Sequence, residues 1–288
     1  MFTFGADPEI FVKKNGNPFS AHDLVPGTKE SPHKTTVGAI QVDGLALEFN
    51  IDPVPQLDFE AFNYNIVKTI ADLRAAVGKG YNFNIASVQD FGKELLEKQP
   101  AKALELGCDP DWNAYTEAVN PSPDAKEVTY RTGAGHIHIG WGTDIPVDNV
   151  DHIKICSNFI KMLDGTVGMF MTCIDRDPRR RELYGKAGAF RPKPYGVEYR
   201  TPSNLWIVNR NRRQIVHSLL NTAIKNQKNN AYDRLFTGYN IERIINTGDV
   251  DAAKYLLNNL IVGYYSPITN ILKKEIEKVE KDLNNAEG

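Results

Sequence analysis

The sequence has few cysteines, no long apolar run and almost no net charge. Its three cysteines, Cys108, Cys156 and Cys173, are scattered, so they form neither a disulfide framework nor a C-x-x-C metal pair. Asp7 and Glu9 interrupt the first apolar run, so we expect no secretory signal there, and no later apolar stretch is long enough to span a bilayer. Lys and Arg number 34 against 36 Asp and Glu. This balance excludes a protein that binds nucleic acid or anionic membranes through an overall positive charge. We therefore expect a cytoplasmic protein with no nucleic-acid and no membrane partner.

Alternating apolar residues are present instead, and they predict strands. Residues 2–14 alternate up to Asn15-Gly16, a pair that is typical of a tight hairpin turn. A second hairpin is predicted from TTVGAIQV and LALEFNI, with Asp43-Gly44 as its turn, so Asp43 is interpreted as a turn residue. The segments 131–141 and 194–203 also alternate, and they predict two further strands.

Helices are predicted between and after these strands, where apolar residues are spaced by three or four. They cover residues 57–78, 147–170 and 209–226 and a C-terminal segment, whereas 175–194 is basic and irregular. This pattern indicates an α+β fold with a largely antiparallel sheet. No linker marks a boundary, so we expect one domain over residues 1–288, with a sheet-forming core at about 2–206 and a helical C-terminal part at about 207–288.

The predicted strands carry polar residues on the side opposite their apolar residues. Residues i and i+2 of a strand point the same way, ~6.6 Å apart at ~3.3 Å per residue. If these strands share one sheet, a single face gathers carboxylates, two imidazoles and a guanidinium. The pairs are Asp7 with Glu9, Glu48 with Asn50, His136 with His138, and Glu198 with Arg200.

Clustered carboxylates repel one another unless cations enter, so this face predicts a metal site. Oxygen ligands with an imidazole suit Mg²⁺ or Mn²⁺ better than zinc, and Mg²⁺ commonly shares the phosphates of a substrate. The basic segment supplies groups that could face such phosphates, because the planar guanidinium of arginine binds phosphate oxygens in pairs. Its candidates are Arg179, Arg180, Arg181, Lys186 and Arg191.

Each of these features also has an ordinary interpretation. A polar strand face is usually solvated, H-x-H can be the outer side of a strand, and Glu198 with Arg200 can be a weak surface ion pair. The remaining histidines, His22, His33, His152 and His217, are interpreted as structural or exposed. The order and combination of the motifs favour a functional site over these alternatives.

The same motifs, read together, resemble a known family. D-P-E in the first strand, an Asp-Gly hairpin before LEFN, GHIHIG and YGKAGAFRPKPYGVEYR resemble the carboxylate–amine ligases of the glutamine synthetase and glutamate–cysteine ligase superfamily. They are most similar to its phage-encoded amidoligases, the COOH–NH₂ ligases of type 2, over about residues 2–206. The resemblance implies a curved, mainly antiparallel sheet that forms an active-site funnel with packed helices. It also implies ATP and two or three Mg²⁺ ions on the concave face.

Roles for individual residues follow from this resemblance. It implies metal ligands at Asp7, Glu9, Glu48, His136 and Glu198, although Asp7 departs from the commoner E-x-E of the family. It implies contacts to the nucleotide or its phosphates from His138, Arg179, Arg181, Lys186 and Arg191. It places Glu48, Arg191 and Arg200 at the reacting groups, and Gly133, Gly135 and Gly140 would leave room for the nucleotide.

The function expected from the residues and the resemblance is ATP- and Mg²⁺-dependent (or Mn²⁺-dependent) amide formation through an acyl phosphate. The partners would be ATP, a carboxylate substrate such as an amino acid or peptide, and an amine acceptor, in the host cytoplasm if a phage encodes the protein. The loop at 107–123, with Trp112, Asn113 and Tyr115, would cover the acceptor side. A metal-dependent hydrolase and a non-catalytic relative are the alternatives, and a homo-oligomer stays open.

Overall fold

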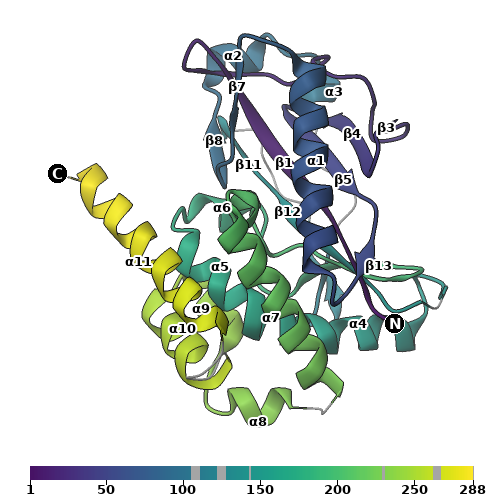
Figure 1. The fold of residues 1–288 in the computed structure, drawn as a ribbon, viewed down its shortest axis with the longest axis vertical. Helices are drawn as coiled ribbons and strands as arrows, with labels where there is room; N and C mark the ends of the chain where they lie inside the picture. The colour runs from purple at the N-terminus through teal and green to yellow at the C-terminus, as the bar shows by residue number, and fades with distance from the viewer. Residues whose placement is uncertain (105–110, 122–127, 143, 229–230, 262–266, 288) are drawn as a thin grey trace.

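The structure is a computed structural model, and it combines a large antiparallel sheet with helices, as the α+β prediction requires (Figure 1). In Figure 1 the sheet and α1 (Phe59–Val77) occupy the upper part of the view, and most of the later helices lie below them. No helix in the described residues is long and apolar enough to cross a membrane. The described residues are 1–104, 111–121, 128–142, 144–228, 231–261 and 267–287.

The sheet is built around β1 (Thr3–Lys14), which lies between β12 (Gly135–Gly140) and β5 (Ala46–Ile51). All described strand pairs are antiparallel. Beyond β12 follow β14 (Gly196–Tyr199), β13 (Ala189–Lys193), β9 (Trp112–Asn113) and β10 (Ala118–Val119). Beyond β5 follow β4 (Gly38–Asp43) and β3 (His33–Lys34), while β2 (Asn17–Phe19), β6 (Val54–Pro55) and β7 (Tyr81–Asn84) pair with parts of β1. A separate small sheet joins β11 (Tyr130–Thr132) to β8 (Val88–Asp90).

The two predicted hairpins form, but the second turn lies one residue later than predicted. Asn15 and Gly16 both have positive φ, 51° and 81°, and connect β1 to β2 as expected. In the second hairpin Asp43 is the last residue of β4, paired with Ala46, and Gly44 turns the chain with φ 57°. The interpretation of Asp43 as a turn residue is therefore wrong. Its side chain continues the alternation of the strand.

The helices follow the predicted periodicity, with one interruption. The helix predicted at 147–170 is α4 (Val150–Leu163), a π-helical turn η1 (Asp164–Gly168) and α5 (Met169–Ile174). The basic segment predicted to be irregular contains α6 (Arg179–Leu183) and β13. The C-terminal part contains α7 (Arg210–Lys228), α8 (Tyr232–Phe236), α9 (Ile241–Thr247), α10 (Val250–Leu256), η3 (Leu257–Ile261) and α11 (Pro267–Glu287). The short helices α2 (Lys93–Glu97), α3 (Ala101–Leu104) and η2 (Asn204–Ile207) complete the described elements.

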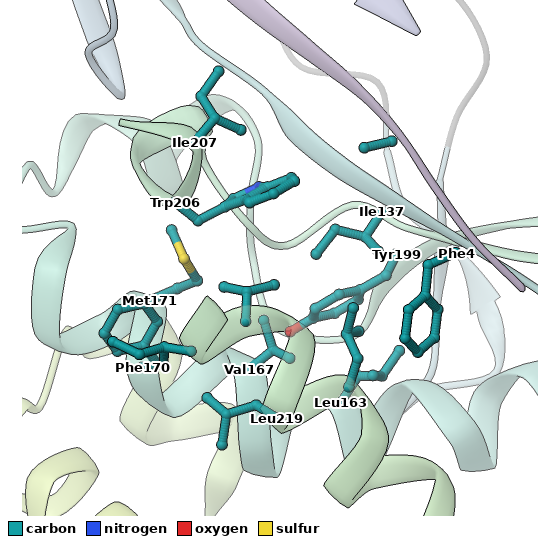
Figure 2. Close-up of a cluster of buried hydrophobic side chains, with 14 of the residues drawn as sticks. Phe4, Ile137, Leu163, Val167, Phe170, Met171, Tyr199, Trp206, Ile207 and Leu219 are labelled. Atoms are coloured by element: carbon teal, nitrogen blue, oxygen red, sulfur yellow. The ribbon is translucent and has the colours of Figure 1, made fainter. Parts of the chain in front are cut away.

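The main core lies between one face of the sheet and the helices (Figure 2). Strand residues Phe4, Ile137 and Tyr199 meet helix residues Leu163 and Val167 there, all of them fully buried. Phe4 and Asp7 differ in parity along β1, so a strand that buries Phe4 in this core presents Asp7 on its other face. The polar face of the sheet therefore lies on the side opposite this core.

Candidate functional site

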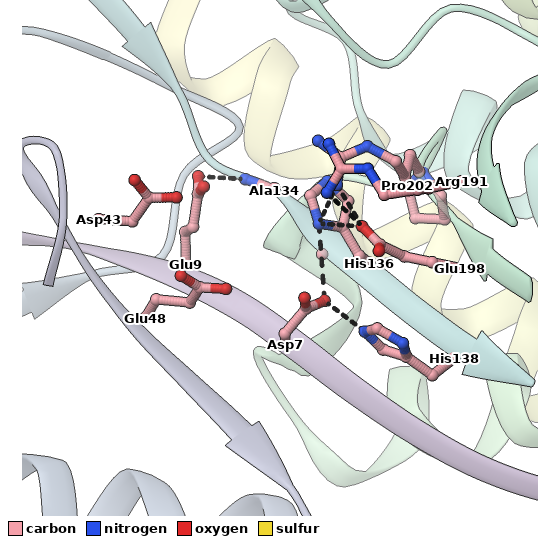
Figure 3. Close-up of polar contacts among 12 residues, drawn as sticks. Asp7, Glu9, Asp43, Glu48, Ala134, His136, His138, Arg191, Glu198 and Pro202 are labelled. Carbon is pink, nitrogen blue, oxygen red and sulfur yellow. Dashed lines mark hydrogen bonds and ion pairs between the residues drawn. The ribbon is translucent and has the colours of Figure 1, made fainter. Parts of the chain in front are cut away.

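The predicted polar strands are neighbours in the sheet, and their register brings the polar residues together (Figure 3). Asp7 lies opposite His136 across β1 and β12, and His138 lies opposite Glu198 across β12 and β14. On the other side of β1, Glu9 lies opposite Glu48 of β5. Residues from distant parts of the sequence thus form one polar face.

One part of this face combines carboxylates with histidines. Asp7 Oδ1 lies 3.1 Å from His138 Nε2 and 3.5 Å from His136 Nδ1. Burial raises the pKa of Asp7, but the two histidines outweigh this, so its pKa is well below the ordinary value. Burial lowers the pKa of His138, but Asp7 and Glu198 outweigh it, and the pKa is raised.

Asp7, His138 and Glu198 fit a divalent cation. They each offer one ligand atom, and these atoms lie within 4.8 Å of one another. Two carboxylates and one imidazole are a donor set that suits Mg²⁺ or Mn²⁺. His138 was predicted as the nucleotide neighbour and His136 as the metal ligand. His136 Nδ1 also lies 3.5 Å from Asp7 Oδ1 and from Glu198 Oε1, so its role as a ligand stays a prediction. The other ring nitrogen of His138 lies 2.6 Å from the Tyr195 hydroxyl, which orients the ring.

Basic side chains surround the buried Glu198. Arg200 forms an ion pair with it, Lys193 Nζ lies 2.7 Å from its Oε2, and Arg191 lies 3.8 Å from its Oε1. Burial raises the pKa of Glu198, but Arg200 and the histidines outweigh it, so the pKa is lowered and the group stays ionised. Three cationic side chains thus surround this one carboxylate.

Asp111 completes the basic cluster, and the sequence argument missed it. Its Oδ1 lies 2.6 Å from Nε of Arg200 and 3.9 Å from Arg191. Burial lowers the pKa of Arg200, but Glu198 and Asp111 outweigh this, so the pKa is raised and the guanidinium remains charged. Asp111 lies in the predicted loop at 107–123 rather than on an alternating strand, so the sequence pattern does not indicate its contact with Arg200.

The other part of the polar face is acidic: Glu9, Glu48 and Asp43 (Figure 3). Burial and the charge of Asp43 raise the pKa of Glu9 to about 7. Burial, Asp7 and Asp43 raise the pKa of Glu48 well above the ordinary value. Neither glutamate forms an ion pair with a described Lys, Arg or His, so this acidic set fits a cation.

Neutral groups hold the two glutamates in place. Gln41 Nε2 donates to Glu48 at 2.6 Å, and the backbone N–H of Ala134 donates to Glu9 at 2.8 Å. Gln41 and Asp43 share the parity of β4 that faces Glu48, because Gln41 pairs with Glu48 in the register. Alternation in TTVGAIQVD was the signal that could have assigned Asp43 to the site.

Of the three consecutive arginines in α6, the middle one lines the cavity over this face. Arg180 is 2% exposed and donates to the backbone carbonyls of Gly133 at 3.2 Å and Pro202 at 2.8 Å. Burial lowers the pKa of Arg180 to about 10. Successive helical residues point about 100° apart, so the neighbours of Arg180 face elsewhere.

Arg179, Arg181 and Lys186 do not line this cavity. Arg179 forms an ion pair of 2.6 Å with Asp177, Arg181 donates to the backbone carbonyl of Asp175, and Lys186 is exposed. The structure therefore does not bring these three predicted phosphate contacts to the polar face, whereas it does bring Arg191 and Arg200 there.

The glycines around the histidine strand serve packing within the protein. A Cβ on Gly135 would lie 2.3 Å from the Ser203 carbonyl oxygen, and one on Gly140 would lie 2.5 Å from the Thr3 hydroxyl. A Cβ on Gly133 would meet the Ala86 carbonyl oxygen at 2.5 Å. The interpretation that they leave room for a nucleotide is wrong, since protein atoms fill the space.

The segment predicted to cover the acceptor side contacts the site through Asp111. Trp112 and Asn113 form β9 and pair with β13, and Tyr115 packs against the main core. None of these three lines the cavity. Residues 107–110 and 122–123 of the predicted cover, with Cys108 among them, lie outside the described residues.

Comparisons with known proteins identify the family. Residues 117–288 match the family model described as phage phiEco32-like COOH.NH2 ligase-type 2. This is more than half of the chain, which therefore belongs to this family of carboxylate–amine ligases. The match includes the histidine strand and Glu198, and it extends through the C-terminal helices, which the sequence motifs had not connected to the family.

No curated protein matches the chain. Among solved structures, the chain is similar to a bifunctional glutathione synthetase from Pasteurella multocida, with a TM-score of 0.43 and 10% sequence identity. The alignment covers 97% of this chain and 47% of that one, so the chain spans about half the length of that protein.

Proposed function

We propose that the protein is an ATP- and Mg²⁺-dependent ligase that joins a carboxylate to an amine through an acyl phosphate. A carboxylate oxygen would attack the γ-phosphorus of ATP with loss of ADP. The amine would then attack the acyl carbon and lose a proton as phosphate leaves. The observation that supports this most is the juxtaposition of the basic cluster around Glu198 with the acidic set on one sheet face.

The residues that would hold divalent cations form two groups. Asp7, His138 and Glu198 would bind one ion, and Glu9 with Glu48 and Asp43 would bind another. Bound Mg²⁺ would neutralise the charge of the phosphates and of the substrate carboxylate, which otherwise repel each other. Without such ions the acidic set keeps buried like charges together, and this costs stability.

The arginines would stabilise the charge that develops on the transferred phosphoryl group. Arg200 is suited to this because Glu198 and Asp111 fix its guanidinium on two sides. Preorganised donors of this kind lower the barrier without having to reorient during the reaction. Arg191 approaches the same two carboxylates at 3.8 and 3.9 Å. It would bind the anion from an adjacent strand.

The test is release of ADP and phosphate in a screen of amino acids, peptides and amines with Mg²⁺ present. We expect ADP formation that depends on an amine, and we expect Arg200→Gln to reduce it by about 100-fold or more. Arg210→Gln is the matched control, because Arg210 pairs with Glu60 on the surface and should leave the rate unchanged. Turnover without ATP would favour a hydrolase, and no Mg·ATP binding in calorimetry would favour a non-catalytic relative.

A further inference from the structure

The cavity also reaches a cationic residue on β11, Arg131. Arg131, Ala134 and His136 all line it, and Ala134 is the residue whose N–H donates to Glu9. Four residues lie between Arg131 and His136, so the two positions are at most about 18 Å apart along an extended chain. Arg131 therefore lines the same cavity as the polar face, and in the described residues no ion pair links it to Glu198 or Asp111.

Arg131 differs in its partners from Arg191 and Arg200, whereas it resembles Arg180, which also donates to backbone carbonyls. One of its terminal nitrogens donates to the backbone carbonyls of Tyr130 at 2.9 Å and Val128 at 3.3 Å. No carboxylate in the described part of the chain lies within 4.0 Å of its guanidinium, whereas Arg200 and Arg191 each approach two. A guanidinium has five N–H donors, so the carbonyls fix the orientation of Arg131 and leave donors that can bind an anion.

The surroundings of Arg131 suit a carboxylate on a small organic molecule. Phe11 and Ala103 contribute apolar surface to the same cavity, and Lys29 adds a second cation, 3.8 Å from Asp43 and half exposed. The acidic set lines the same cavity, so it would repel a ligand that carries only negative charges. A molecule that carries both an amine and a carboxylate would satisfy both signs of charge.

We infer that Arg131, with Lys29 in the same cavity, binds a carboxylate that does not react, so one of the two joined substrates is an amino acid or peptide with a free carboxylate. This rests on the proposed function, because the reacting carboxylate must lie near Arg191 and Arg200, where the phosphoryl group is transferred. Arg131 then selects acids over their neutral analogues.

The test compares acids with their carboxamides. The common amino acids and a set of dipeptides, each as the acid and as the C-terminal amide, are titrated by calorimetry with Mg²⁺ and a non-hydrolysable ATP analogue. We expect at least one acid to bind about 30-fold more tightly than its amide, the value of a charge-assisted pair. Arg131→Gln should remove this preference and leave amide binding unchanged, and Arg131→Lys should retain part of it.

Arg243→Gln is the control, because Arg243 is exposed and approaches Asp249 rather than the cavity. Equal binding of every acid and its amide, or a loss of ATP-analogue affinity instead of acid affinity in Arg131→Gln, would overturn the inference. The proposed function can be refuted independently of this inference. Acid-selective binding without any ADP formation would refute the ligase and leave only the carboxylate site at Arg131 standing, whereas amide formation that ignores the acid would refute only the inference.

Discussion

Glu9 on β1 lies directly opposite Glu48 on β5, and both side chains point to the polar face of the sheet. Like charges directly opposite each other on neighbouring strands are destabilising. The pair can be kept only if protons or cations neutralise it. Burial and the charge of Asp43 raise the pKa of both glutamates, and the charge of Glu9 adds to the raised pKa of Glu48.

Stability without divalent cations should fall as the pH rises. The folded-state pKa of Glu9 is raised, by burial and by Asp43, from 4.5 to about 7. Its stabilising contribution is therefore fully present below about pH 4.5 and is lost as the pH rises through about 7. In thermal unfolding with a chelator, we expect the melting temperature to decrease from pH 5 to pH 8, and Mg²⁺ or Mn²⁺ to restore it more at pH 8.

Glu48→Gln should reduce both the pH dependence and the stabilisation by metal. The matched control is Glu94→Gln, since Glu94 is an exposed residue of α2. A cation effect of equal size at pH 5 and pH 8 in the unchanged protein would contradict the assignment of the acidic set.

Glu48→Gln should also abolish turnover while the fold stays intact. The amide keeps the size of the side chain but removes one charge from the acidic set, so the cation would lose a ligand. We expect the amine-dependent rate of ADP release to fall by about two orders of magnitude or more, with an unchanged circular dichroism spectrum. Near-normal activity would show that Glu48 holds no essential metal.

Asp43→Asn tests the residue that was predicted to belong to the turn and not to the site. Because Asp43 raises the pKa of both Glu9 and Glu48, its neutralisation should lower both values. We expect about 10-fold or more weaker Mn²⁺ binding, measured by calorimetry at pH 8. Asp52→Asn is the control because Asp52 is exposed and does not line the cavity. Equal Mn²⁺ affinity in both variants would exclude Asp43 from the site.

Asp164→Ala should loosen β14, which carries Glu198 and directly precedes Arg200. Asp164, in the π-helical turn, accepts hydrogen bonds from the Tyr199 hydroxyl at 2.7 Å and from the Gly188 N–H at 2.6 Å. Removal leaves both donors buried and unpaired, at a cost of about 1–3 kcal/mol each. Chemical denaturation should show this loss, and adding Tyr199→Phe should cost less than it does in the unchanged protein. Strictly additive effects would mean that the two residues are not coupled.

Trp112→Ala tests the proposed cover on the acceptor side. Trp112 pairs with Phe190 of β13 and follows Asp111, which holds Arg200. We expect the KM of the amine to rise and kcat to fall, with little change in the KM of ATP, in steady-state kinetics. If the amine KM and kcat both stay unchanged, the segment has no covering role.

Much of the site could be predicted because its signal is local. Side chains on a strand alternate with a period of two, so Asp7 and Glu9, His136 and His138, and Glu198 and Arg200 each share a face once their strands form. Asp43 was missed because the turn lies one residue later than predicted, so Asp43 belongs to β4 and lies on the same side of it as Gln41.

The sequence by itself determined the strands, their polar faces and the residue types that suit a metal and a phosphate. Only the tertiary structure decided which strands are neighbours, and thereby that Glu9 meets Glu48 and that His138 joins Asp7 and Glu198. It also decided that Arg180 rather than Arg179 or Arg181 faces the cavity, and that Asp111 reaches Arg200. These outcomes depend on long-range packing of helices against the sheet, which sets strand order and helix rotation, whereas alternation depends only on the local geometry of the chain.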